Sequence, residues 1–365
     1  MSLSVSNLSK KYGEKTALED LSFEMEKPGV YALLGTNGAG KTTAIRMMLN
    51  MLSRDSGEVL WNGKALDTAA CNVGYLAEER GLYPKYALMD QLIYFAGLRG
   101  VSRADAKKRI AYWAKRLEVE EYLYPGKVQP EQSQQNLYGS DEKTGAAKEE
   151  RTGAAGHERT GAAGHEKTGN AKHERKAVGR KRRKKAAKPL RADQLSKGNQ
   201  QKIQFMMALI SDPELIILDE PMSGLDPVNT DLFRSIIHEE IEKGKYLIMS
   251  SHQMATVEEF CTDIIILNRS KTILQGNLNE IKKSFGRIHL SIKVEQNIDS
   301  YIEKAGAELI SEKEGEYELK VSGEAQANQL LGMLITDGIV VIRFDLREPS
   351  LHEIFVKKVG EANEV

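Results

Sequence analysis

The sequence predicts an α/β fold, because short apolar runs typical of buried strands alternate with segments that have helical periodicity. Residues 31–34 are one such run; a glycine-rich turn follows it, and apolar residues then recur at helical spacing over residues 42–52. Residues 215–218 are a second run, bounded by Asp212-Pro213 and Pro221, as expected of a strand buried on both faces. With 365 residues, of which 41% are hydrophobic, one large domain and a small one are expected.

The glycine-rich turn at residues 35–42, GTNGAGKT, has the composition and position of a phosphate-binding loop. Gly38 and Gly40 allow backbone N–H groups to approach phosphate oxygens. The helix that follows adds the partial positive charge of its N-terminus. At this spacing Lys41 reaches the β- and γ-phosphates, and the Thr42 hydroxyl binds Mg²⁺. The turn therefore predicts a nucleotide site.

Two carboxylates follow the second apolar run. Asp219 falls at the C-terminal end of the strand, where open α/β sheets bind ligands, and its carboxylate can hold Mg²⁺ directly or through water. Glu220 is the candidate base that polarises the attacking water. The alternative is that both are solvated acids that end a strand.

A third motif, LSKGNQQK at residues 195–202, makes the set specific. In this order the motifs resemble those of ATP-binding subunits of ABC transporters, over most of residues 1–285, and in particular those of the ABC-2 type exporters of the sodium-efflux and antibiotic-resistance group. GYLAEERGLYP, at residues 74–84, resembles the Q-loop of that group. The resemblance implies a P-loop NTPase core of ABC type with an antiparallel β subdomain and a helical subdomain, and it implies ATP and Mg²⁺ as cofactors.

The resemblance also implies roles for individual residues. Tyr12 stacks on adenine, unless it is an ordinary tyrosine of an edge strand, and His252 is the switch histidine that senses the γ-phosphate. The phosphate loop contributes further nucleotide contacts, from Gly35, Asn37 and Thr43. A second group completes the ATP site of another subunit and consists of Ser196, Gly198, Asn199 and Asp226.

The chain departs from the superfamily pattern in two places. Glu78 stands where the Q-loop glutamine is expected; its carboxylate can still take part in Mg²⁺ binding, but it cannot donate a hydrogen bond when ionised. Lys197 and Asn199 replace the usual Gly and Gln of the signature. Ser196 and Gly198 remain, and a hydroxyl with a bare backbone N–H is what a γ-phosphate needs.

The expected domain organisation follows from the resemblance and from periodicity. Residues 1–285 are expected to form the ABC ATPase domain, with a helical subdomain at about 81–128 that receives the membrane partner. Residues 286–365 are expected to form a small α+β domain, with strands at 288–294, 317–321 and 340–344 and helices at 325–336 and 351–359.

A low-complexity insert at about 129–188 interrupts the first domain. It contains an eight-residue repeat that starts at Glu142, and then a basic run, RKRRKK, at residues 180–185. Between Tyr138 and Leu190 the only large apolar residue is Val178, so we predict that the insert is disordered and dispensable. The alternatives are weak lipid contact through the basic run and metal binding by His157, His165 and His173.

The remaining expectations concern location and function. Two cysteines, Cys71 and Cys261, favour a reducing compartment, and no apolar run approaches the roughly 18–20 residues of a membrane span. We expect a cytoplasmic subunit, peripheral at the inner face of the membrane through a permease subunit. It is expected to power an exporter as an ATP-sandwich homodimer or heterodimer, with no specific nucleic acid as partner. The alternatives are a non-transport ABC ATPase acting on ribosomes or nucleic acid, and an ATPase impaired by its insert.

Overall fold

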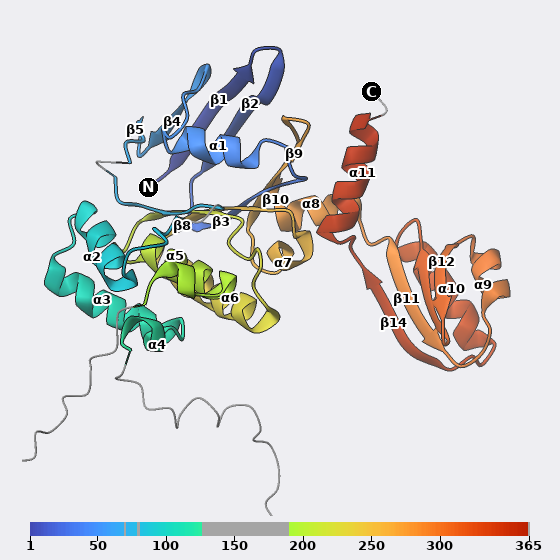
Figure 1. Ribbon diagram of the computed structural model, residues 1–365. Helices are drawn as coiled ribbons and strands as arrows, with labels where there is room; N and C mark the ends of the chain where they lie inside the picture. Colours follow the sequence, from blue (N-terminus) through green and yellow to red (C-terminus); the bar gives the residue numbers. More distant parts are fainter. Residues whose placement is uncertain (69–70, 79–80, 126–189, 364–365) are drawn as a thin grey trace, which may run out of the picture.

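The computed structural model describes residues 1–68, 71–78, 81–125 and 190–363. Within these ranges the chain forms a ten-stranded sheet and a separate four-stranded sheet, each with its own helices (Figure 1). The expected insert at 129–188, with its three histidines and its basic run, lies outside the described residues. The expectations about it stay predictions.

The large sheet has the strand order β5-β4-β1-β2-β10-β9-β3-β8-β7-β6. Its first part is antiparallel and consists of β1 (Leu3–Tyr12), β2 (Lys15–Met25), β4 (Ser56–Trp61) and β5 (Lys64–Ala65). β10 (Lys271–Asn277) joins this part to β9 (Asp263–Asn268). The remaining strands run parallel to β9 and are β3 (Gly29–Gly35), β8 (Tyr246–Ser251), β7 (Leu215–Asp219) and β6 (Val73–Leu76).

The parallel strands are buried on both faces, as their uninterrupted apolar runs predict. In β7, Ile216 and Leu218 belong to one hydrophobic core, whereas Leu215 and Ile217 belong to another. The same alternation occurs in β3, β8 and β9. Because successive side chains of a strand point to opposite faces, this pattern requires a covering layer on each side.

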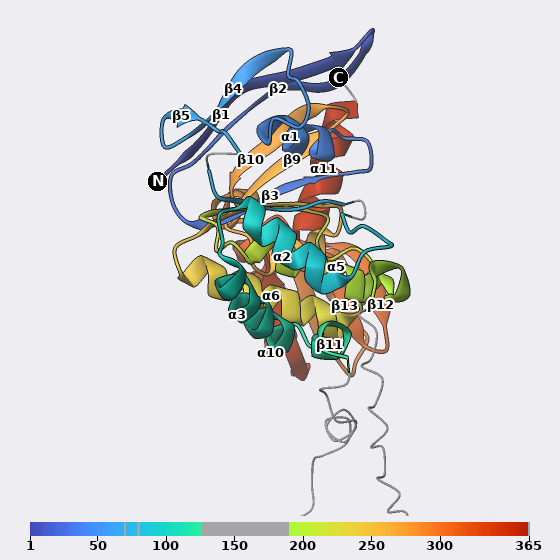
Figure 2. The same cartoon turned by 60° about the vertical axis from the view of Figure 1, so that its left-hand side comes forward.

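Helices supply both layers (Figure 2). α1 (Lys41–Met48) packs between the parallel strands and the antiparallel part of the sheet. The opposite face is covered by α5 (Lys197–Leu209), α6 (Pro227–Glu242) and α7 (Met254–Glu258). α8 (Leu278–Phe285) follows β10, and a short 3-10 helix, η2 (Ala192–Gln194), precedes α5. Beside α5 lie α2 (Leu88–Leu98), α3 (Arg103–Arg116) and α4 (Glu120–Leu123). The predicted α/β fold with antiparallel and helical parts is therefore confirmed.

One expected helix is shorter than predicted. Helical spacing over residues 42–52 predicts a helix to Leu52, but α1 ends at Met48. Asn50 has a left-handed backbone with φ 55°, and the N–H groups of Met51 and Leu52 both donate to the Arg46 carbonyl. These hydrogen bonds satisfy carbonyl groups at the C-terminal end of α1. The apolar residues that follow Met48 therefore lie in a turn and not in the helix.

The four-stranded sheet has the order β12-β13-β11-β14 and is antiparallel throughout. Its elements in chain order are β11 (His289–Val294), α9 (Asp299–Ala305), β12 (Glu308–Lys313), β13 (Glu316–Lys320), α10 (Glu324–Thr336) and β14 (Val341–Arg347). Sequence reasoning missed α9 and β12. Every side chain of β12 is exposed, so this strand lacks the apolar alternation that identifies a half-buried strand.

The last helix, α11 (Leu351–Asn363), leaves the small sheet and packs on the large one (Figure 1). Leu351 and Ile354 are fully buried in the core that includes Val257 of α7. The Leu351 N–H donates to Glu258 Oε2 at 2.9 Å, which satisfies one free donor of the helix N-terminus. The domain limits 1–285 and 286–365 stay a prediction.

Within the described ranges, none of the helices combines the length and the hydropathy that a membrane span requires.

We predict that Leu351→Ala destabilises the large domain by about 2–5 kcal/mol, because it removes a fully buried side chain and leaves a cavity. Val356→Ala, at an exposed position of the same helix, is the matched control and is expected to stay within about 0.5 kcal/mol of the wild type. Urea denaturation measures both. Equal effects of the two variants would contradict the buried position of α11.

Candidate active site

The glycine-rich turn has a backbone that only glycine adopts easily. Gly38 and Gly40 have φ values of 80° and 111°, in the left-handed region. A Cβ on Gly40 would also lie 2.7 Å from the Ala17 carbonyl oxygen. Because Gly40 is the N-cap of α1, this close approach fixes where the helix begins and directs its N-terminus at the turn.

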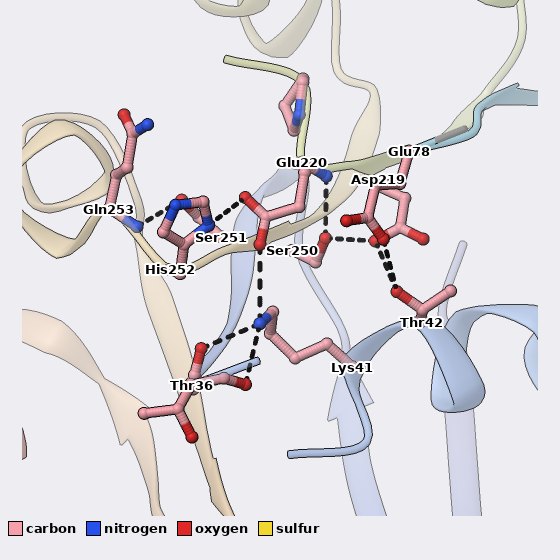
Figure 3. Close-up of polar contacts among 12 residues, drawn as sticks. Thr36, Lys41, Thr42, Glu78, Asp219, Glu220, Ser250, Ser251, His252 and Gln253 are labelled. Atoms are coloured by element: carbon pink, nitrogen blue, oxygen red, sulfur yellow. Dashed lines mark hydrogen bonds and ion pairs between the residues drawn. The ribbon is translucent and has the colours of Figure 1, made fainter. Parts of the chain in front are cut away.

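Lys41 is buried at the centre of the turn. Its ammonium donates to the carbonyls of Gly35 at 2.8 Å and Thr36 at 3.3 Å, and it lies 3.5 Å from Glu220 Oε1 (Figure 3). The loop therefore supplies two neutral acceptors to this cation, and Glu220, after β7, supplies a carboxylate. This arrangement holds the lysine charge where the turn and the helix N-terminus converge.

Asp219 is fully buried at the end of β7. Its Oδ1 accepts from Ser250 Oγ at 2.5 Å and lies 3.3 Å from Thr42 Oγ1. Its Oδ2 has no hydrogen-bond partner among the described residues. Burial raises the pKa of Asp219; the hydrogen bonds from Ser250 and Thr42 oppose the rise, and the neighbouring charges of Glu78 and Glu220 add to it.

Glu220 connects the lysine to the histidine. Its Oε2 lies 2.9 Å from His252 Nδ1, on the side opposite Lys41. Its backbone is left-handed, with φ 51°, a conformation that costs a non-glycine residue roughly 1–2 kcal/mol. The Glu220 N–H donates to Ser250 Oγ at 2.9 Å, which holds this conformation at the end of the strand.

Ser250 is the site residue whose role the sequence did not reveal. Its hydroxyl donates to Asp219 Oδ1 and accepts from the Glu220 N–H, so one side chain at the end of β8 orients two acids after β7. The sequence feature that could have indicated this role is the polar pair Ser250-Ser251, which directly follows an apolar run. The register that places Ser250 opposite Asp219 is a property of the sheet.

A cleft of about 340 Å³ lies over these groups. It brings together most of the residues predicted to bind nucleotide in this chain, namely Tyr12, Asn37, Gly38, Gly40, Lys41, Thr42 and Thr43. The predicted metal ligand Glu78 and the predicted base Glu220 line it as well. Residues that sequence reasoning missed also line it: Lys15, Thr16, Ala17 and Ser270. Tyr12 is exposed at the end of β1, where it pairs with Lys15 of β2 and has no partner in β4, so both interpretations of Tyr12 stay predictions.

The residues predicted to serve another subunit lie away from this cleft and do not line it. Ser196 is the N-cap of α5 and accepts from the Asn199 N–H at 3.2 Å. Asp226 is the N-cap of α6 and accepts from the Asn229 N–H at 2.9 Å. A Cβ on Gly198 would lie 3.7 Å from the Leu225 side chain, so the starts of the two helices are adjacent.

The residues present fit a magnesium ion. Mg²⁺ prefers oxygen ligands and is usually held by one or two carboxylates together with substrate phosphates. Thr42 Oγ1 and the unpartnered Asp219 Oδ2 are such oxygens, and Glu78 Oε2 lies 3.3 Å from the Thr42 hydroxyl. No group of three or more His, Cys, Asp or Glu in the described part of the chain could hold a metal. Phosphate and water would therefore complete the coordination sphere.

The fold and this site define an ABC-type ATPase, and the comparisons agree. The family model described as "ABC transporter" matches residues 18–223, more than half of the chain, and a model described as "ATP-binding protein DrrA1-3-like, C-terminal domain" matches residues 276–359. The chain belongs to the ABC transporter family. Members of this family hydrolyse ATP in transporters, and the chain is an ATPase of this kind.

Two relatives align with nearly the whole chain. The "Uncharacterized ABC transporter ATP-binding protein YhaQ" of Bacillus subtilis is 33% identical, over 99% of this chain and 100% of its own length. The "Linearmycin resistance ATP-binding protein LnrL" of the same organism is 25% identical over 98% of both chains. A solved structure described as "Structure of ATP binding subunit of ABC transporter" has a TM-score of 0.56 at 23% identity, covering 78% of this chain and 93% of its own. That structure supports the fold.

Asp219→Asn is predicted to stabilise the protein in EDTA, and increasingly so as the pH rises. Because burial raises the pKa of Asp219 above 3.8, the protonated acid contributes stability that is complete below pH 3.8 and is lost as the pH rises through the raised pKa. The asparagine does not ionise and keeps the Ser250 contact. Melting temperatures of both proteins from pH 4 to 8 test this. A variant that is less stable than the wild type at every pH would contradict it.

Proposed function

We propose that this chain is the ATP-binding and ATP-hydrolysing subunit of an exporter, and that it works as an ATP-sandwich dimer with a separate membrane subunit. One observation carries the proposal: the cleft contains Lys41, Thr42 and Glu220, whereas the start of α5 lies elsewhere. Each cleft is therefore only half of a complete site. A second subunit supplies the other half.

Nucleotide binding uses the chain's own loop. ATP enters the cleft with its adenine against the exposed ring of Tyr12; base–aromatic stacking contributes about 1–3 kcal/mol. Lys41 exchanges the carbonyls of Gly35 and Thr36 for phosphate oxygens. Backbone N–H groups of the loop bind the remaining phosphate oxygens, and the N-terminus of α1 adds its positive charge.

Hydrolysis uses Glu220. Its carboxylate takes the proton from the attacking water, and His252, 2.9 Å from Glu220 Oε2, orients the carboxylate and contacts the γ-phosphate. Thr42, Asp219 and Glu78 would hold Mg²⁺. When bound, this ion neutralises charge that develops on the phosphate oxygens.

The dimer supplies the remaining donors. Ser196 contributes its hydroxyl and Gly198 its backbone N–H to the γ-phosphate that is bound in the cleft of the second subunit. Asn199 and Asp226 contact that nucleotide from the same side. The dimer is a homodimer or a heterodimer with a related ATPase, and no nucleic acid takes part.

An exposed apolar region around α2 fits the membrane partner. Met51, Tyr94 and Leu98 are more than half exposed. Met51 and Leu98 line an apolar groove of about 410 Å³, together with Phe95 and Met207. Contiguous exposed apolar surface marks interaction sites. We infer that a cytoplasmic segment of an integral membrane permease occupies the groove and holds the chain at the inner face of the membrane.

Glu220→Gln is expected to reduce ATP hydrolysis at least about 100-fold while ATP binding is retained, because the shape is kept and the base is lost. Size-exclusion chromatography with ATP should then show an accumulated dimer. Ser196→Glu tests the other half of the site, which each subunit contributes to its partner's cleft. This variant should bind ATP in its own cleft but form no dimer. Hydrolysis by Glu220→Gln at the wild-type rate would refute the assignment of the base.

The partner surface is tested by Leu98→Asp, which places a charge in the apolar groove. We expect recovery of a polytopic membrane protein from native membranes to fall at least about tenfold, because burying an unpaired charge is unfavourable. Tyr112→Asp, at an exposed position of α3 outside the groove, is the matched control. Recovery of ribosomes or DNA without a membrane protein would instead favour a non-transport ATPase.

A further inference from the structure

We propose that Ser270 is a positioning residue for ATP, because its hydroxyl fixes the strand end that carries Tyr12 relative to the phosphate loop. The inference rests on the proposed function, since it concerns ATP that binds in the same cleft with its adenine on Tyr12. Ser270 belongs to none of the nucleotide-binding motifs, and the fold brings it to the cleft.

Ser270 is the second residue of the two-residue turn between β9 and β10. Arg269 and Ser270 both have a left-handed backbone, with φ values of 48° and 71°, as type I′ hairpin turns require. Glycine is strongly favoured at the second position of such a turn. Here a serine that is only 7% exposed adopts this backbone and lines the cleft. A strained non-glycine residue at a functional site indicates a role for its side chain.

Three hydrogen bonds connect Ser270 to both the phosphate loop and β2. Its N–H donates to the carbonyl of Ala39, in the loop, at 3.2 Å. Its carbonyl accepts from the Glu19 N–H at 2.8 Å, and its hydroxyl donates to the Thr16 carbonyl at 2.9 Å. One buried residue therefore joins the phosphate loop to two points on β2.

The hydroxyl contact lies beside the predicted adenine contact. Thr16 pairs with Lys11 across the β1–β2 hairpin, and its neighbour Lys15 pairs with Tyr12. Tyr12, Lys15 and Thr16 all line the cleft. Holding the Thr16 carbonyl therefore holds the end of the hairpin that presents the Tyr12 ring.

Backbone pairing alone does not hold this end of β2 against β10. In the described sheet the two strands pair at one position, Glu19 with Lys271. The ladder thus does not extend to Thr16, three residues nearer the hairpin turn. The Ser270 hydroxyl makes the contact at that level.

ATP spans both sides of this connection. Its phosphates bind the loop and its adenine binds Tyr12, so its affinity depends on the distance between two linked binding regions. A ligand that occupies only the phosphate loop does not depend on that distance. Inorganic tripolyphosphate is such a ligand, and comparing it with ATP separates positioning from a general loss of structure.

The test is isothermal titration calorimetry of the full chain with Mg²⁺ and either ATP or inorganic tripolyphosphate. Ser270→Ala should weaken ATP binding about three- to tenfold, the range that one net hydrogen bond represents. Tripolyphosphate should bind within about twofold of the wild type. Ser270→Gly adopts the left-handed backbone without strain but also lacks the hydroxyl, so it should match Ser270→Ala.

Ser284→Ala is the matched control. The Ser284 hydroxyl also donates to a backbone carbonyl, that of Ile281 at 2.7 Å, but it lies on α8 and outside the cleft. This variant should bind both ligands like the wild type.

A double variant tests the route of the effect. If the hydroxyl acts through the hairpin that carries Tyr12, Ser270→Ala should have little further effect on ATP binding once Tyr12→Ala has removed the ring. Fully additive losses in the double variant would overturn the inference.

Two further outcomes overturn it. One is ATP binding at wild-type affinity by both Ser270 variants. The other is an equal loss of ATP and tripolyphosphate binding, which would indicate a structural role only. These measurements need neither hydrolysis nor a dimer. A wild type that does not bind ATP would instead contradict the proposed function, whose base Glu220→Gln tests separately.

Discussion

The site depends on negative charge collected at one edge of a parallel sheet. β7 and β8 end side by side, so the acids after β7 share a hydroxyl from the end of β8, and neither acid can move without breaking that shared contact. Lys41 reaches the same edge from the turn after β3, the strand that pairs with β8 on its other side. Lys41, Ser250 and the two acids thus come from the ends of three neighbouring strands, β3, β8 and β7.

The two hydrophobic cores give this edge its rigidity. Each parallel strand contributes alternate side chains to the core around α1 and to the core around α5 and α6, so no strand can shift by one residue without exposing an apolar face. α1 is fixed further by the close approach of Gly40 to Ala17 of β2. The antiparallel part of the sheet therefore takes part in placing the phosphate loop, although its only contribution to the cleft is at the ends of β1 and β2.

The sequence predicts the central strands β3 and β7 and the phosphate-binding part of the cleft, because the physical causes of both are local. Apolar runs indicate strands that are buried on both faces, and the spacing of Gly38, Gly40 and Lys41 indicates a loop that binds phosphate. The Ser250 bridge could not be predicted in this way, since it depends on the register between β7 and β8. The left-handed backbone of Glu220 is held by that same bridge. Exposed β12 has no hydrophobic pattern to detect, and the roles of individual site residues stay predictions.

The position of α11 has a consequence for how the chain is made. Leu351 and Ile354 fill space in a core whose other walls include α7 and α6, so that core lacks part of its apolar packing until α11 has been synthesised. Domains generally fold as units during translation, starting from the N-terminus. Here the large domain must wait for a helix that comes after the whole small sheet. During elongation on the ribosome the face of α7 stays exposed, and the nascent chain presents to chaperones an apolar surface that the finished protein conceals.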